Sequence, residues 1–174
     1  MITTIPTVSP SFLERYPRQI LGLIALVCVG MLAFGLYLQH VVGLEPCPMC
    51  IVQRYALIAV ALAAGIAALL PSRTALWGGV GLMAVFSVFG AGVAARQTWL
   101  QWYPPEIMSC GRDFFGMIES FPLRRAIPMI FRGSGDCSVI DWTFLGLSIA
   151  NWSFLSFAAV TLAGLALWLK RAPA

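Results

Sequence analysis

Two cysteines separated by two residues, Cys47 and Cys50 in EPCPMCIVQR, stand directly before a long apolar stretch. A Cys-x-x-Cys pair at the start of a helix can do redox chemistry, because the helix dipole and the unpaired amides of the first turn stabilise a thiolate. If the helix begins near Cys50, that cysteine is the better stabilised of the two. The pattern therefore predicts thiol–disulfide exchange at this position.

Arg54 lies one helical turn beyond Cys50, inside the apolar stretch. Residues four apart share a helix face, so its guanidinium can favour a Cys50 thiolate or donate hydrogen bonds to a ligand carbonyl or anion. An ionisable side chain inside an apolar span indicates a functional site. The alternative is an arginine that snorkels to the membrane interface, which its position near the span end allows.

The chain holds three further cysteines, Cys28, Cys110 and Cys137. Cys28 sits in LIALVCVGMLAF without a polar neighbour and is expected to behave as a small hydrophobe. Four cysteines allow three pairings, of which the short spacings favour Cys47 with Cys50 and Cys110 with Cys137. A second pair on a loop with nearby glycines can relay electrons between a soluble thiol partner and a membrane-bound acceptor by thiol–disulfide exchange.

Two other interpretations of the four cysteines stay open on these residues alone. They could form structural disulfides, although a loop of two residues closes little chain entropy. They could also supply four thiolates to a zinc ion, although Cys110 and Cys137 lack close spacing and an oxidising compartment disfavours free thiolates.

The elements that must position these residues are membrane helices. The 174 residues are 60% hydrophobic and 10% charged, far from a soluble composition. Four stretches are each about long enough to cross roughly 30 Å of hydrocarbon as a helix. We predict an all-α membrane protein, a four-helix transmembrane bundle forming one domain over residues 1–174, with spans at approximately 20–39, 51–70, 75–95 and 152–169.

The predicted outer loops cover approximately residues 40–50 and 96–151, and the longer one carries a predicted short interfacial helix at Phe114 to Phe131. Arginines and lysines set the orientation, because positive charge in short loops marks the cytoplasmic side. Both chain ends and the link at 71–74 carry these charges, at Arg15, Arg18, Arg73, Lys170 and Arg171. We expect both termini in the cytoplasm and the cysteine-bearing loops outside. The net charge of +4 is explained by this topology and indicates no nucleic-acid partner.

Four segments together resemble DsbB, a family of bacterial inner-membrane thiol:quinone oxidoreductases. They are PCPMCIVQR, the upstream Gln39 and His40, WLQWYPP, and SGDCSVIDWTFLGLS around Cys137. The likeness covers nearly the whole chain in order, including the four spans and both cysteine pairs.

The resemblance implies an enzyme that generates disulfides de novo. It would reoxidise a periplasmic DsbA-like dithiol oxidase of thioredoxin fold and pass two electrons to a membrane quinone, ubiquinone or menaquinone. The oxidase would attack Cys110, Cys137 would then attack Cys47, and Cys50 would be released as a thiolate beside the quinone. The resemblance also implies that Arg54, Gln53 and Gln97 bind the quinone, and it implies no metal.

Overall fold

The computed structural model describes residues 16–104 and 135–170 of the chain. These residues contain four helices long and apolar enough to cross a membrane. They are α2 (Pro17–His40), α3 (Pro48–Leu69), α4 (Arg73–Trp102) and α8 (Ile149–Leu169). The prediction of an all-α, four-span bundle is confirmed. The predicted helix at 114–131, like Cys110, lies outside the described residues.

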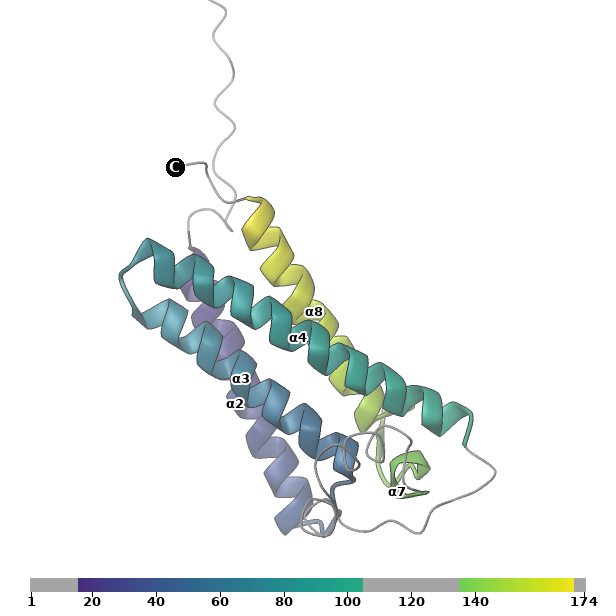
Figure 1. Cartoon of the computed structure of the whole chain (residues 1–174). Helices are drawn as coiled ribbons and strands as arrows, with labels where there is room; N and C mark the ends of the chain where they lie inside the picture. Colours follow the sequence, from purple (N-terminus) through teal and green to yellow (C-terminus); the bar gives the residue numbers. More distant parts are fainter. Residues whose placement is uncertain (1–15, 105–134, 171–174) are drawn as a thin grey trace, which may run out of the picture.

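The helices run alternately up and down, α2 packing on α3, α3 on α4 and α4 on α8. Figure 1 shows the start of α2, the α3–α4 link and the end of α8 at one end of the bundle. The short helix α7 (Gly135–Ser138) lies at the opposite end, where α2 ends and α3 begins. The basic residues Arg18, Arg73 and Lys170 therefore lie at the other end of the bundle from Cys47.

Local sequence explains where the helices begin. Pro48 occupies the first turn of α3, where its missing N–H costs nothing. Ser72 caps α4 and Ser148 caps α8, each hydroxyl accepting a hydrogen bond of 3.4 Å from the amide three residues on. α4 continues to Trp102, beyond the approximate boundary at residue 95, because the next helix-breaking residue is Pro104.

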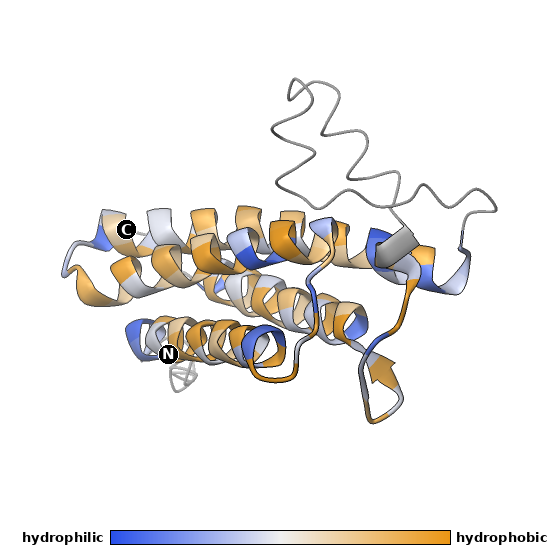
Figure 2. Ribbon diagram, turned by 90° about the horizontal axis from the view of Figure 1, so that it is seen from below, coloured by the Kyte–Doolittle hydropathy of each residue, from blue (hydrophilic) through white to orange (hydrophobic). Residues whose placement is uncertain are grey.

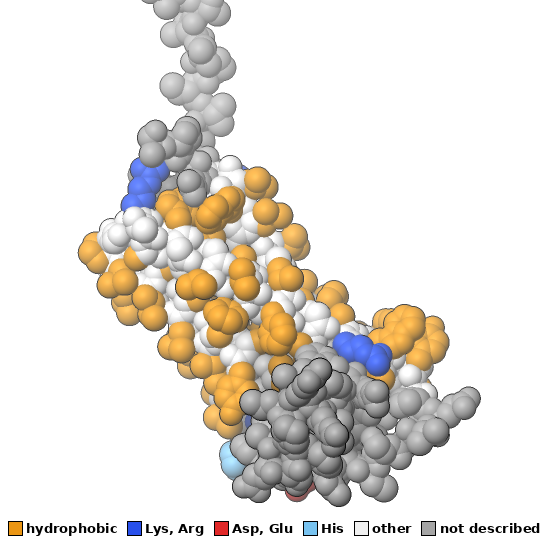
Figure 3. Space-filling view, in the orientation of Figure 1, with side chains coloured by type: hydrophobic (Ala, Val, Ile, Leu, Met, Phe, Trp, Pro, Cys, Tyr) orange, Lys and Arg blue, Asp and Glu red, His pale blue; other side chains and the backbone are white. Residues whose placement is uncertain are grey.

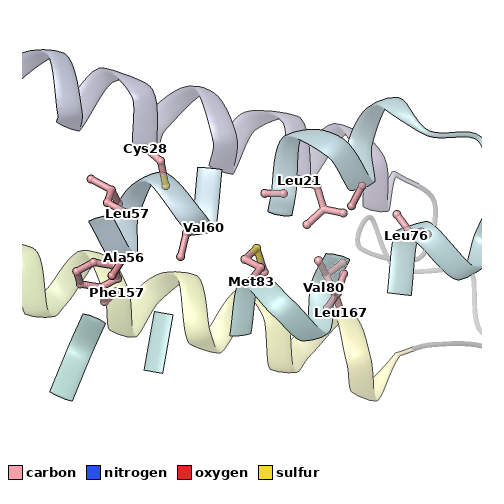
Figure 4. Close-up of a cluster of buried hydrophobic side chains, with 12 residues drawn as sticks. Leu21, Cys28, Ala56, Leu57, Val60, Leu76, Val80, Met83, Phe157 and Leu167 are labelled. Atoms are coloured by element: carbon pink, nitrogen blue, oxygen red, sulfur yellow. The ribbon is translucent and has the colours of Figure 1, made fainter. Parts of the chain in front are cut away.

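The bundle interior is apolar and closely packed (Figure 4). All four long helices contribute to one buried cluster, which includes Leu21, Val60, Met83 and Phe157. Small residues let the helices approach: a Cβ added at Gly90 would lie 2.5 Å from the Phe157 ring.

Large apolar side chains also cover the outside of the helices, as Figure 3 shows over the middle of the bundle. Figure 2 shows the same distribution along the ribbons, with the more hydrophilic residues gathered toward the helix ends. An outer surface of this kind suits the hydrocarbon core of a membrane, because its apolar side chains form no hydrogen bonds with water.

A small hairpin that the sequence analysis did not predict precedes α8. Strand β1 (Thr143–Phe144) pairs antiparallel with β2 (Leu147–Ser148). The two-residue turn between them needs positive φ at both positions, and Leu145 and Gly146 have φ of 52° and 78°. The indole N–H of Trp152 donates to the Phe144 carbonyl at 3.1 Å, which ties the hairpin to α8.

Candidate functional site: a buried cysteine cluster beside an apolar cavity

Cys47 and Cys50 lie together at the start of α3. Cys47 is the N-cap residue, and its sulfur accepts a hydrogen bond of 3.4 Å from the Cys50 amide. The two sulfurs are 3.0 Å apart, so a small movement brings them to the roughly 2.05 Å of a disulfide bond. Cys50 stands within the first helical turn, as the sequence analysis required for thiolate stabilisation.

Cys137, on α7, reaches the same place from a distant part of the chain. It is fully buried and packs with Cys47 and Met49 of the α3 start and with Val93 and Leu100 of α4. Cys47 is hydrogen-bonded to both Cys137 and Cys50. Cys47 therefore shares hydrogen bonds with both of the other cysteines of the cluster.

This position sets the ionisation of Cys47. Its hydrogen bonds to Cys137 and to Cys50, together with burial, raise the pKa of Cys47 above the ordinary thiol value. A thiol that holds its proton strongly is a poor leaving group in disulfide exchange. Attack on Cys47, with Cys50 leaving, is thus favoured over attack on Cys50.

Arg54 follows Cys50 by one turn of α3, and α2 holds its guanidinium in place. Its Nη1 donates to the Gln39 amide oxygen, and its Nη2 donates to the Gly35 carbonyl at 3.0 Å. Gly35 lies directly against the guanidinium, since a Cβ there would stand 3.6 Å from two of its nitrogens. Arg54 is therefore an anchored side chain whose hydrogen-bond partners lie on the neighbouring helix.

Gln53 and Gln97 are both buried, and Gln97 lies beside the sulfurs. The Gln97 NH₂ group donates to Cys47 Sγ and to Cys50 Sγ, each at 3.3 Å. Its amide oxygen accepts from Gln53 Nε2 at 2.6 Å. The two glutamines thus link α3 to α4 at the level of the cysteine pair.

An apolar cavity of about 810 Å³ opens beside this cluster. Cys50, Arg54, Gln53 and Gln97 line it, together with apolar residues of α2, α3, α8 and the hairpin. Its aromatic wall is continuous, because Phe34, Trp142, Phe144 and Trp152 make successive ring contacts at centroid distances of 5.8, 6.1 and 6.0 Å. A mostly apolar cavity of this size with few polar groups suits a small hydrophobic ligand.

Comparisons with known proteins agree with this arrangement. The family model for disulfide bond formation protein DsbB matches residues 17–167. The chain belongs to the DsbB family. Disulfide bond formation protein B of Polaromonas sp. is 69% identical over 157 residues, which cover 90% of this chain and 94% of that protein. Those of Albidiferax ferrireducens and Azoarcus sp. are 63% and 56% identical, each alignment covering at least 90% of both chains.

DsbB proteins are membrane dithiol:quinone oxidoreductases that reoxidise DsbA, and this chain is accordingly a multi-pass, disulfide-forming membrane oxidoreductase. Of the residues singled out in its sequence, the structure brings together Cys47, Cys50, Cys137, Gln53 and Gln97, with Arg54 on the same cavity wall. The placement of Cys110 lies outside the described residues.

Sequence reasoning missed two groups of residues in this DsbB-family site. Gln39 was noted only as part of a motif, yet it accepts a hydrogen bond from Arg54. A polar residue at the end of an apolar span could have indicated an arginine partner. The aromatic residues Trp142, Phe144 and Trp152 are not among the predicted site residues, because their contribution to a cavity wall depends on the hairpin.

Proposed function

We propose that this protein takes electrons from a periplasmic DsbA-like dithiol oxidase and delivers them, through Cys110–Cys137 and then Cys47–Cys50, to a quinone held in the 810 Å³ cavity. The observation that carries the proposal is that Cys47 is hydrogen-bonded both to Cys137 and to Cys50. That order matches a relay in which electrons enter at the loop pair and leave at Cys50.

The internal exchange conserves atoms and electrons. A thiolate of the partner bonds to Cys110 Sγ as a mixed disulfide, the Cys110–Cys137 bond breaks, and Cys137 leaves as a thiolate. Cys137 then bonds to Cys47 Sγ, the Cys47–Cys50 bond breaks, and Cys50 leaves with the electron pair. The raised pKa of Cys47 supports this direction, because the opposite attack would expel the poorer leaving group.

The residues around the cavity fit a quinone. Its walls are apolar and aromatic, and the Arg54 guanidinium on its lining can donate N–H groups to a carbonyl oxygen. A bound quinone supplies a two-electron acceptor. Arg54, held by Gln39 and Gly35, orients that oxygen and stabilises negative charge beside Cys50. Gln53 and Gln97 complete the polar side of the site.

We further infer that the chain is a single membrane domain of the bacterial inner membrane, with both termini cytoplasmic and the cysteine end periplasmic. The separation of Arg18, Arg73 and Lys170 from Cys47 supports this orientation. The outer segments would then be residues 41–47 and 103–148. They are shorter than the loops expected from the sequence, because the helices extend further than the predicted spans. Alkaline phosphatase fused after Lys170 should be inactive, and the same enzyme inserted within residues 105–134 should be active.

A coupled assay tests the activity. Purified protein in detergent is given a reduced DsbA-like oxidase and either a ubiquinone or a menaquinone analogue, and quinone absorbance and partner thiols are followed together. We expect one quinone to be consumed for each partner disulfide formed, and none without the partner. Full turnover by the Cys50→Ser variant would refute the relay.

A trapping experiment tests the contact between the two cysteine pairs. In a Cys50→Ser/Cys110→Ser variant treated with diamide, Cys47 and Cys137 should form a disulfide that peptide mass spectrometry detects. Cys28 should form no disulfide with Cys47 or with Cys137. Pairing of Cys47 with another copy of the chain, in place of Cys137, would contradict the order of sulfurs proposed here.

A further inference from the structure

The donors that face the sulfur pair point to a role for Gln97 other than quinone binding. Its side chain comes from α4 and is only 4% exposed. Its NH₂ group lies 3.3 Å from both Cys47 Sγ and Cys50 Sγ. The Arg54 guanidinium, by contrast, directs its hydrogen bonds to Gln39 and Gly35 on α2. Apart from the thiols themselves, the side chain that donates to these sulfurs among the described residues is therefore a neutral amide.

Gln53 sets which end of the Gln97 amide faces the sulfurs. The Gln53 NH₂ donates to the Gln97 oxygen at 2.6 Å, and Gln53 is 5% exposed. If the Gln97 amide were turned over, two NH₂ groups would face one another and the amide oxygen would face the sulfurs. That orientation loses a hydrogen bond in a buried site, where an unsatisfied donor is costly.

The same amide serves both ionisation states of Cys50. A protonated Cys50 can donate to the Gln97 oxygen, which lies 3.7 Å from its sulfur. A Cys50 thiolate can accept from the Gln97 NH₂ at 3.3 Å without any movement of the amide. The cysteine can therefore change charge while the surrounding side chains stay in place, which is the property of a preorganised site.

We propose that Gln97 is the hydrogen-bond donor that stabilises the charge developing on Cys50 when Cys137 attacks Cys47, and that Gln53 is the positioning residue that orients it. In that step the Cys47–Cys137 bond forms, the Cys47–Cys50 bond breaks, and the electron pair goes to Cys50. Gln97 keeps its protons throughout. The inference deepens the proposed relay by naming what lowers the barrier to its internal exchange.

Two near-isosteric substitutions at each glutamine test the proposal. Gln97→Met removes the donor and keeps the length of the side chain, and Gln97→Glu replaces the donor with a second acceptor. Gln53→Met removes the positioning bond, and Gln53→Glu presents an acceptor that draws the Gln97 NH₂ away from the sulfurs. Gln19→Met is the matched control, because Gln19 is exposed at the far end of α2.

The measurements use neither quinone nor partner. In the reduced protein, the rate of Cys50 alkylation by iodoacetamide is followed against pH by site-resolved mass spectrometry. For Gln97→Met we expect the rate near neutral pH to fall about tenfold, the effect of losing one hydrogen bond to a charged group. The pH profile of Cys50 alkylation in Gln97→Met should move to higher pH than in the wild type. The shift should be larger in Gln97→Glu and smaller in Gln53→Met.

Equilibration in glutathione buffers gives an independent reading. Loss of the donor destabilises the reduced form of the Cys47–Cys50 pair. The equilibrium constant for its reduction by glutathione should therefore fall about tenfold in Gln97→Met, which lowers the reduction potential by about 30 mV. A wild-type pH profile and potential for Gln97→Met would overturn the proposal. If that variant does not fold, the same two measurements on Gln53→Glu decide it.

These readouts separate this inference from the proposed function. If the wild type fails to reduce quinone but Gln97→Met shows the predicted shifts in alkylation profile and potential, the relay is refuted and the role of the amide stands. Normal quinone coupling in the wild type with no shift in any glutamine variant would refute only the role of the amide.

Discussion

Cys28 and Cys47 are both buried, yet their surroundings differ completely. Cys28 lies in the middle of α2 within the apolar cluster, at 1% exposure, among side chains such as Leu57 and Val60. Cys47 lies at a helix start, at 7% exposure, and has two sulfurs and an amide NH₂ as neighbours. Burial alone therefore does not make a cysteine inert; the lack of an exchange partner and of donors to a thiolate does.

The same contrast holds between the interior of the bundle and its cysteine end. The cluster that contains Leu21 and Met83 is apolar and depends on shape, because glycines and alanines let the helices touch. The cluster around Cys47 is held by sulfur and amide hydrogen bonds between α3, α4 and α7. One region should respond to changes in volume, the other to changes in hydrogen-bonding chemistry.

The largest expected effect separates the two cysteines. Cys47→Ala should reduce partner-dependent quinone reduction to the uncatalysed level, because the proposed relay passes through the sulfur that bonds to both Cys137 and Cys50. Cys28→Ala should leave turnover unchanged and cost about 1 kcal/mol of stability through a small cavity. Steady-state assays and thermal unfolding in detergent measure both. A loss of turnover in Cys28→Ala with the fold intact would break the comparison.

Removal of the arginine should have the next largest effect. Arg54→Ala deletes the hydrogen bonds to Gln39 and Gly35 and the donors offered to a quinone oxygen. We expect kcat/KM for quinone to fall by about 10² or more, as for the loss of a preorganised donor to developing charge. The diamide-driven pairing of Cys47 with Cys137 should continue in the corresponding triple variant. Equal loss of both would show that Arg54 supports the fold instead.

A pair of glycines on α4 tests the shape-dependent region. Gly90→Ala places a methyl group 2.5 Å from the Phe157 ring, so we expect a loss of about 1–3 kcal/mol from overpacking. Gly92→Ala, two residues on, meets no atom within 4 Å and should gain about 0.4–1 kcal/mol from reduced chain entropy. Thermal unfolding in detergent compares them. Equal stabilities of the two variants would contradict the close contact of α4 with α8.

The smallest effect concerns pH. The folded protein holds the Cys47 thiol neutral, since its pKa is raised by Cys137, Cys50 and burial, whereas the unfolded chain ionises it near pH 8.5. The unfolded state therefore binds fewer protons above that pH, and the stability of the reduced protein should decline as the pH rises. Cys137→Ala should lower the pKa of Cys47 by removing its largest cause. Alkylation of Cys47 against pH checks this; an unchanged profile would refute the contact.

Much of the fold followed from local sequence. Four apolar stretches predicted the four helices, because a backbone in hydrocarbon must satisfy its hydrogen bonds internally. Pro48 and Ser148 mark helix starts that a capping argument can find. The hairpin at 143–148 could not be found in this way, since its turn holds Leu145 at a positive φ that this residue type rarely adopts.

The candidate site likewise has a part that local sequence predicts and a part that depends on how the helices pack. The spacing of Cys47, Cys50 and Arg54 along one helix was sufficient to predict redox chemistry with a charge one turn away, because a helix repeats every 3.6 residues. Gln97 and Cys137 reach those sulfurs from 47 or more residues away, and no local period relates them. The Gln39 partner of Arg54 likewise comes from another helix.

By itself, then, the sequence determined the four apolar helices and predicted disulfide exchange at the cysteines, since both depend on composition and short spacing. Only the tertiary structure decided the hydrogen-bond partners of Cys47, the orientation of the Gln97 amide and the cavity beside Cys50. The physical reason is that each of these depends on distances between helices, which packing sets. A hydrogen bond of about 3 Å requires the two helices that carry its ends to be correctly placed.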